Sequence, residues 1–115
     1  MSVVGGMNVR AAGLRLNATS PFARLSVSDD GVRLSGNGLL RRLLPQRTCT
    51  FADLEFAQAV RGWTSTGVAL HVRGGSLWYF WTKSYVDVLG VLSSHGVSTR
   101  DELKRVHYSD QTDWP

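Results

Sequence analysis

The sequence contains a single cysteine, Cys49, among 115 residues. One thiol cannot form an internal disulfide, so we expect the chain to fold without cross-links in a reducing, cytoplasmic compartment. No apolar run approaches the roughly 20 residues that a membrane-spanning helix needs. Residues 1–6 lack the basic flank and the long apolar stretch of a secretory signal. The sequence therefore predicts neither a membrane span nor a signal peptide.

Charged residues are also sparse, at 19% of the chain, whereas hydrophobic residues make up 43%. This balance excludes compositional disorder, and a chain of this length forms one small domain. Thirteen basic and nine acidic residues give a net charge of +4. That excess is compatible with anionic partners but is far below that of a dedicated nucleic-acid binder, so we expect no nucleic-acid partner.

Residue patterns that support catalysis or metal binding are missing as well. His71, His95 and His107 stand too far apart in the sequence to match a zinc-ligand spacing. Cys49 falls in a predicted strand, where a small buried side chain is its common role. The carboxylates are scattered through predicted turns and helix starts. We therefore predict no enzyme activity, no catalytic residue, no metal site and no cofactor.

Alternating apolar and polar residues predict a mainly β fold. The clearest case is the strand 23–28, which is followed by the turn signal Asp29-Asp30-Gly31 and a return strand over 32–35. Comparable patterns complete a set of seven predicted strands, over residues 14–18, 47–51, 54–60, 68–72 and 77–81.

The pattern changes from strand to helix after residue 82. Ser84 and Asp87 have the spacing of a capping box, and apolar residues recur at helical spacing over 85–92. Gly96 predicts the helix end, and Gly90 suggests close packing within the helix. We therefore predict one domain over residues 8–96 that ends in an amphipathic helix. Residues 97–115 are predicted to form a short polar helix and a loose tail.

Aromatic residues concentrate at positions 78–81, with the sequence Trp-Tyr-Phe-Trp. Consecutive side chains of a strand point to opposite faces, so at most half of these rings can share one core. The others need cover from the helix, from a partner subunit or from solvent, and we favour helix packing or dimerisation. Trp63, in a predicted turn, is the aromatic residue that we expect to be exposed and available for binding.

Residues 39–47 interleave Arg41, Arg42 and Arg47 with four leucines. Arginine side chains suit phosphate or carboxylate, and leucines can enter a membrane surface or a partner's groove. Alternatively, the leucines belong to the core and the arginines form its solvated reverse side. The three arginines and Trp63 are the candidate residues for ligand or partner binding.

The chain resembles a pleckstrin-homology-like (PH-like) domain of the small bacterial kind that is related to GRAM domains. The resemblance rests on residues 21–34, on the Thr-Phe-Ala-Asp-Leu step at 50–54 and on the Phe-Trp pair at 80–81. Residues 17–31 also resemble the opening N-A-T-x-P-x-A-x-L-x-V-S-x-D-G of actinobacterial-type proteins.

This resemblance implies orthogonal sheets of four and three strands, forming a bent sheet or partly open barrel that one C-terminal helix caps. It does not carry over phosphoinositide binding, because only Arg15 and Arg24 lie near the connection expected at 18–21. The expected function is a non-enzymatic binding module that recognises a protein or peptide or associates with itself. The alternative is a peripheral domain that binds anionic lipid through Arg41, Arg42 and Arg47.

Overall fold

The computed structural model describes residues 1–11, 14–38, 41–42 and 46–106. For residues 11 and 14–16 it describes the backbone alone. Eight strands form one mixed, open sheet in the order β4-β3-β2-β1-β7-β6-β5-β8. The strands are β1 (Ser2–Ala11), β2 (Leu14–Ser28), β3 (Gly31–Gly36), β4 (Arg47–Cys49), β5 (Leu54–Arg61), β6 (Thr66–Val72), β7 (Ser76–Trp81) and β8 (Thr99–Arg105). The predicted mainly β fold with one helix is confirmed for the described residues, although the strands number eight rather than seven.

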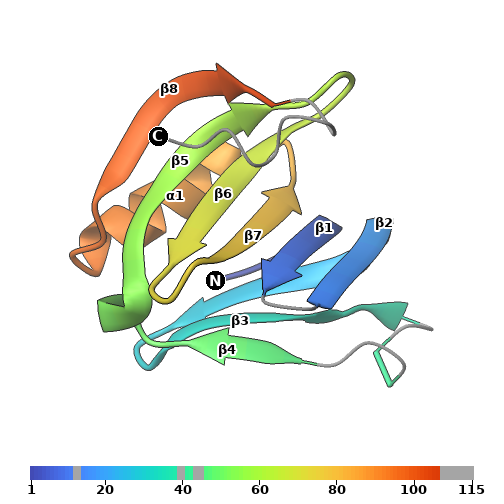
Figure 1. The fold of residues 1–115 in the computed structure, drawn as a ribbon, viewed down its shortest axis with the longest axis horizontal. Helices are drawn as coiled ribbons and strands as arrows, with labels where there is room; N and C mark the ends of the chain where they lie inside the picture. The colour runs from blue at the N-terminus through green and yellow to red at the C-terminus, as the bar shows by residue number, and fades with distance from the viewer. Residues whose placement is uncertain (12–13, 39–40, 43–45, 107–115) are drawn as a thin grey trace.

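The sheet bends so that two groups of strands lie at an angle to each other (Figure 1). One group is β4-β3-β2-β1 and the other is β7-β6-β5, and the antiparallel pairing of β1 with β7 joins them. The helix α1 (Tyr85–Ser94) packs against β5, β6 and β8. The helix α1 therefore covers the inner face of the second group of strands. A short 3-10 turn, η2 (Phe51–Asp53), leads into β5.

The first strand of the sheet was not predicted from the sequence. β1 contains Gly5 and Gly6, which interrupt the alternation of apolar and polar residues. A Cβ atom on Gly5 would collide with the carbonyl oxygen of Trp81, so glycine allows β7 to approach closely. The predicted strands 14–18 and 23–28 are parts of the single strand β2, and the connection expected at 18–21 lies inside it.

The strand β8 replaces the short polar helix predicted after residue 97. β8 runs parallel to β5, with an irregularity between the pairs Gln58↔Arg100 and Val60↔Lys104. The side-chain amide of Gln58 donates hydrogen bonds to the backbone oxygens of Arg100 and Glu102 there. The sheet thus extends beyond both ends of the predicted domain 8–96. The predicted tail at 108–115 lies outside the described residues.

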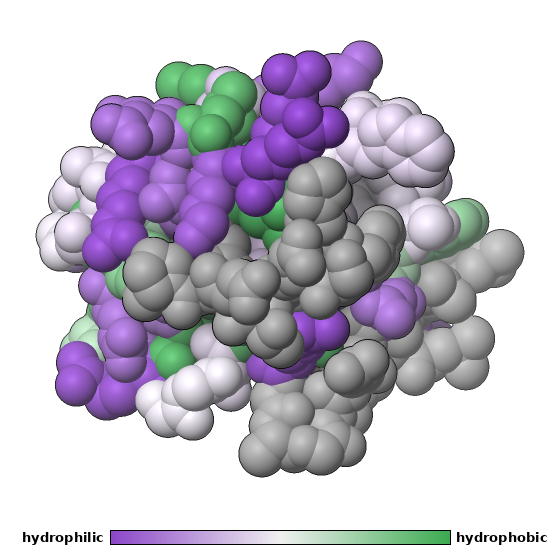
Figure 2. Space-filling view, turned by 45° about the horizontal axis from the view of Figure 1, so that its top comes forward, coloured by the Kyte–Doolittle hydropathy of each residue, from purple (hydrophilic) through white to green (hydrophobic). Residues whose placement is uncertain are grey.

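The two edges of the sheet differ from its centre. β4 has three residues, and most side chains of β8 are exposed and charged. In Figure 2, hydrophilic residues make up much of the coloured surface, beside smaller hydrophobic groups. Short or charged edges discourage the addition of strands from other chains.

Apolar side chains pack on both faces of β7. Trp78 and Phe80 belong to the main core, which also contains the buried helix residues Val88, Leu89 and Leu92. On the opposite face, a smaller cluster is formed by Val60, Ala69, Leu77, Tyr79 and Val106, with Trp81 packed against it. Trp78, Tyr79 and Phe80 are therefore buried within the single chain.

The helix has the predicted apolar face and the predicted glycine at its end. Gly96 has a φ of +85°, and its N–H donates to the carbonyl of Ser93 while that of Val97 donates to Leu92. This is a Schellman motif, and it needs a residue that tolerates positive φ.

Two details of the helix prediction were wrong. Ser84 makes no capping hydrogen bond through its side chain, because its ψ of 28° departs from the extended conformation that places an N-cap hydroxyl. The space around a Cβ atom on Gly90 is open, so close packing does not explain this glycine.

Candidate binding site

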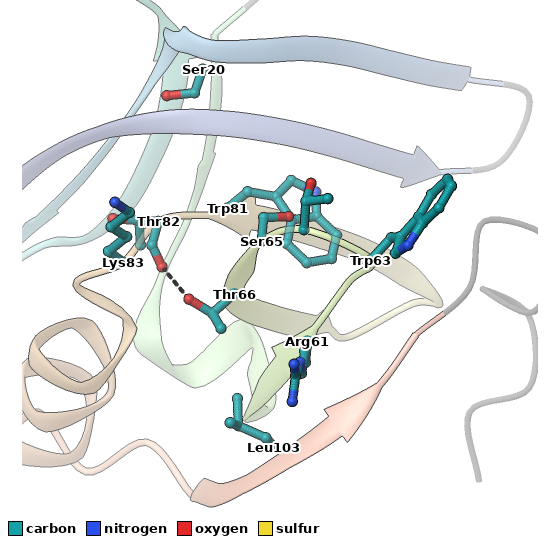
Figure 3. Close-up of a pocket in the computed structure, with 10 residues that line it drawn as sticks. Ser20, Arg61, Trp63, Ser65, Thr66, Trp81, Thr82, Lys83 and Leu103 are labelled. Carbon is teal, nitrogen blue, oxygen red and sulfur yellow. Dashed lines mark hydrogen bonds between the residues drawn. The ribbon is translucent and has the colours of Figure 1, made fainter.

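Two adjoining hollows lie beside the turn between β5 and β6, at residues 62–65. They have volumes of about 620 and 930 Å³, within the range of ligand pockets. They share Ser20, Trp63, Thr64, Ser65 and Trp81. The smaller one is also lined by Arg61, Thr66, Thr82, Lys83 and Leu103 (Figure 3). The larger one is also lined by Gly6, Asn8, Asn17, Ala18, Thr19, Gly62, Arg105 and Val106. We call the pair the turn hollows.

Trp81 forms the shared floor of the turn hollows. Its ring stacks on Tyr79 with ring centres 5.8 Å apart. Its indole Nε1 donates a hydrogen bond of 2.6 Å to Oδ1 of Asn8. The Asn8 amide in turn donates one of 2.6 Å to Oδ1 of Asn17. Because Asn8 is only 8% exposed, this chain of bonds gives the floor a fixed geometry.

Backbone features of three strands shape the walls. The register of β1 and β2 steps from Gly5↔Ala23 to Met7↔Ala18, so residues 19–22 of β2 bulge outward opposite Gly6. This bulge places Thr19 and Ser20 at the rim. On the other side, the β5–β6 turn is closed by a 2.8 Å bond from the Gly62 N–H to the Ser65 carbonyl.

Gly62 also lies directly over the floor. A Cβ atom there would come within 3.2 Å of the Trp81 ring, so the turn rests on the indole with little space between them. A Cβ atom at this position therefore requires the indole or the turn to shift by a few tenths of an ångström.

Trp63 projects from the tip of the turn. Its side chain is 93% exposed, as the sequence predicted. Among the other exposed large hydrophobic residues that the structure describes, Val86 is 64% exposed and the rest are less than half exposed. In Figure 3, Trp63 stands at one end of the site and Lys83 at the other, with Trp81 between them. A fully exposed indole beside a hollow is a common feature of binding surfaces.

The charged residues that the structure describes around the turn hollows all have one sign. Arg61, Lys83 and Arg105 are exposed, and the described lining residues include no carboxylate. Arg61 and Arg105 are register partners on β5 and β8, which places two cationic residues side by side. Within the described part of the chain, none of the three side chains makes an ion pair or hydrogen bond. The site therefore favours an anionic ligand.

Of the four candidate residues predicted from the sequence, only Trp63 lines the turn hollows. Arg41 and Arg42 are exposed in the connection between β3 and β4. Arg47 is partly buried at the start of β4, where it pairs with Leu34. The four leucines of this segment lie outside the described residues.

Two titratable side chains elsewhere have shifted pKa values. Burial and the nearby Asp53 raise the pKa of the Cys49 thiol to about 11. The thiol is therefore protonated at neutral pH and a poor nucleophile. Burial, with smaller effects from Arg100 and Lys104, lowers the pKa of His71 to about 4.

His71 belongs to a small stack that links β8 to the sheet. Its ring stacks on Phe56 with centres 4.0 Å apart, and the Arg100 guanidinium lies 3.8 Å from the centre of the same Phe56 ring. The neutral imidazole is favoured here because a charged one would lie among cations with part of its hydration removed.

Within the described ranges, no three His, Cys, Asp or Glu side chains gather closely enough to hold a metal ion. Over those residues, no helix has the length and apolar character needed to cross a membrane.

A comparison with family models finds no match for this chain, and a comparison with curated proteins finds none either. The candidate site therefore rests on geometry and charge alone.

Proposed function

We propose that this chain is a non-enzymatic, PH-like binding module that recognises a protein or peptide partner at the turn hollows. The observation that carries the proposal is the fully exposed Trp63 beside a hollow with a fixed aromatic floor, Trp81. Such a pairing supplies an anchor and a preformed surface, which together limit the entropy lost on binding.

The strand order supports the PH-like assignment. Four strands, β4-β3-β2-β1, and three strands, β7-β6-β5, precede α1 in the way that the resemblance leads us to expect. The strand β8, which follows the helix and pairs parallel to β5, is an addition to that arrangement. It contributes Leu103 and Arg105 to the turn hollows, so the addition bears on the proposed site.

Recognition of a different protein is favoured over self-association. Dimerisation was one of the two roles expected for the aromatic run at 78–81, beside helix packing, but three of its four rings are buried within the chain. The charged edge strand β8 and the short edge strand β4 offer little for pairing between copies.

A peptide-display selection on the immobilised full chain tests this function. We expect linear peptides whose affinity falls at least about tenfold on Trp63→Ser, because exposed tryptophans are frequent binding hot spots. Val86→Ser is the matched control, since Val86 is exposed on the helix and does not line the turn hollows. Peptides that bind Trp63→Ser as well as the original chain, or no enrichment at all, would contradict the proposal.

The lipid alternative predicts a different result. In that case, vesicles containing phosphatidylserine should bind the chain, and replacing Arg41 and Arg42 by glutamate should abolish binding in a strongly salt-dependent way.

A further inference from the structure

The geometry points to an acidic, extended peptide segment with an apolar residue at its centre as the partner of the turn hollows. This inference rests on the proposed function and adds the chemistry of the ligand. Its three grounds are the unpaired cations, the aromatic surfaces between them and an open strand edge beside the larger hollow.

The cations stand on both sides of the aromatic floor. Arg61 and Lys83 line the smaller hollow, and Arg105 lines the larger one. Some other cations of the described chain are already engaged: Arg24 donates to Ser2 and Asn37, and Arg73 donates to the backbone oxygen of Ala52. Among the described residues, these cations have no partner and the lining has no carboxylate, so they attract carboxylates that approach from either side of Trp81.

The space between the cations suits an apolar side chain. Trp81 offers a ring face at the floor of both hollows, and Trp63 and Leu103 offer apolar surface at the rim. A ligand that is only an anion would leave these surfaces exposed to water. A ligand with acidic residues around an apolar one would use both features at once.

The backbone beside the larger hollow favours a chain over a compact small molecule. β3 pairs with β2 only from Ala23 to Ser28. In the described part of the chain, the edge of β2 over residues 17–20 that faces away from β1 has no strand partner. An extended peptide can hydrogen-bond to such an edge while its side chains enter a neighbouring pocket.

Fluorescence anisotropy with two labelled octapeptides tests the inference. The acidic probe has a central Leu-Trp pair flanked by three glutamates on each side, and the neutral probe has glutamine in place of every glutamate. We expect the full chain to bind the acidic probe at least about tenfold more tightly. We also expect its affinity to fall about three- to tenfold when NaCl rises from about 50 to about 500 mM.

Two charge-matched variants separate the site from the overall charge. Arg61→Glu with Lys83→Glu changes the net charge from +4 to 0, and Arg41→Glu with Arg42→Glu makes the same change outside the turn hollows. We expect the first variant to lose about tenfold or more in affinity for the acidic probe and the second to lose less than about threefold. Circular dichroism and thermal melts establish that both variants are folded.

The outcomes distinguish this inference from the proposed function. Equal losses in the two variants would show that net charge drives binding and would overturn the inference. Display peptides that depend on Trp63 but carry no acidic residues would also overturn it, while the proposed function would stand. If neither the display library nor the acidic probe binds at the turn hollows, both fail.

Discussion

Replacing Asn8 by alanine should loosen the floor of the turn hollows. The change removes the acceptor of the Trp81 indole N–H and the donor to Asn17. Asn17 is exposed and can bond to water, whereas the Trp81 N–H faces the nearly buried position 8. A buried donor left without an acceptor costs about 1–3 kcal/mol, and because Trp81 is only partly buried we expect about 1–2 kcal/mol. In a domain of this size, that loss lowers the melting temperature by about 4–10 °C.

Urea denaturation followed by circular dichroism measures this loss, with Asn17→Ala as the matched control. The control removes the exposed end of the same bonded chain and should cost no more than about 0.5 kcal/mol. A cycle of Asn8→Ala, Trp81→Phe and the double variant should give a coupling energy of at least about 0.5 kcal/mol. The reasoning is refuted if Asn8→Ala is as mild as Asn17→Ala, or if the two changes are additive.

Three further predictions concern the rest of the fold. Gly90→Ala should stabilise the chain by about 0.5–1 kcal/mol in urea melts, because the position is open and lies within a helix; destabilisation would reveal a contact there. Gln58→Ala should cost about 1–3 kcal/mol and speed amide hydrogen exchange in β8 above all, because the β8 carbonyls that it bonds lose their donor. His71 should make stability depend on pH. In the unfolded chain its imidazole takes up a proton near pH 6.5, whereas in the folded chain it does so only near pH 4. Stability is therefore lost as the pH falls through this window. Partial exposure limits the effect to about 1 kcal/mol, and His71→Phe should abolish that part of the loss between pH 7 and 4.5.

Sequence periodicity identified the elements with one buried face and one solvated face. The hairpin around Asp29 and Asp30 and the helix over residues 85–94 are such cases, because their apolar residues recur with the period of the element. Gly96 was also informative, since the helix end there requires positive φ.

The elements missed by the sequence reasoning lack that one-sided pattern. In β8, exposed charged residues hide a strand that depends on its pairing with β5 and on the Gln58 amide, which is distant in sequence. In β1, the pair Gly5-Gly6 hides a central strand, because glycine is unfavourable in strands except where another backbone approaches closely. In both cases tertiary contacts determine the structure.

The position of the candidate site follows from the way β7 is covered. Four consecutive aromatic residues indicated that two faces needed cover, but not which element would supply it. The helix covers the face of Trp78 and Phe80, whereas the small cluster around Tyr79 only partly covers the opposite face. Trp81 is the last residue of β7 and lies at the margin of that cluster, so its ring remains accessible from the turn hollows. A partner therefore meets aromatic surface where the second cluster ends, and Trp63 was recognisable in the sequence because a tryptophan in a tight turn has no core to enter.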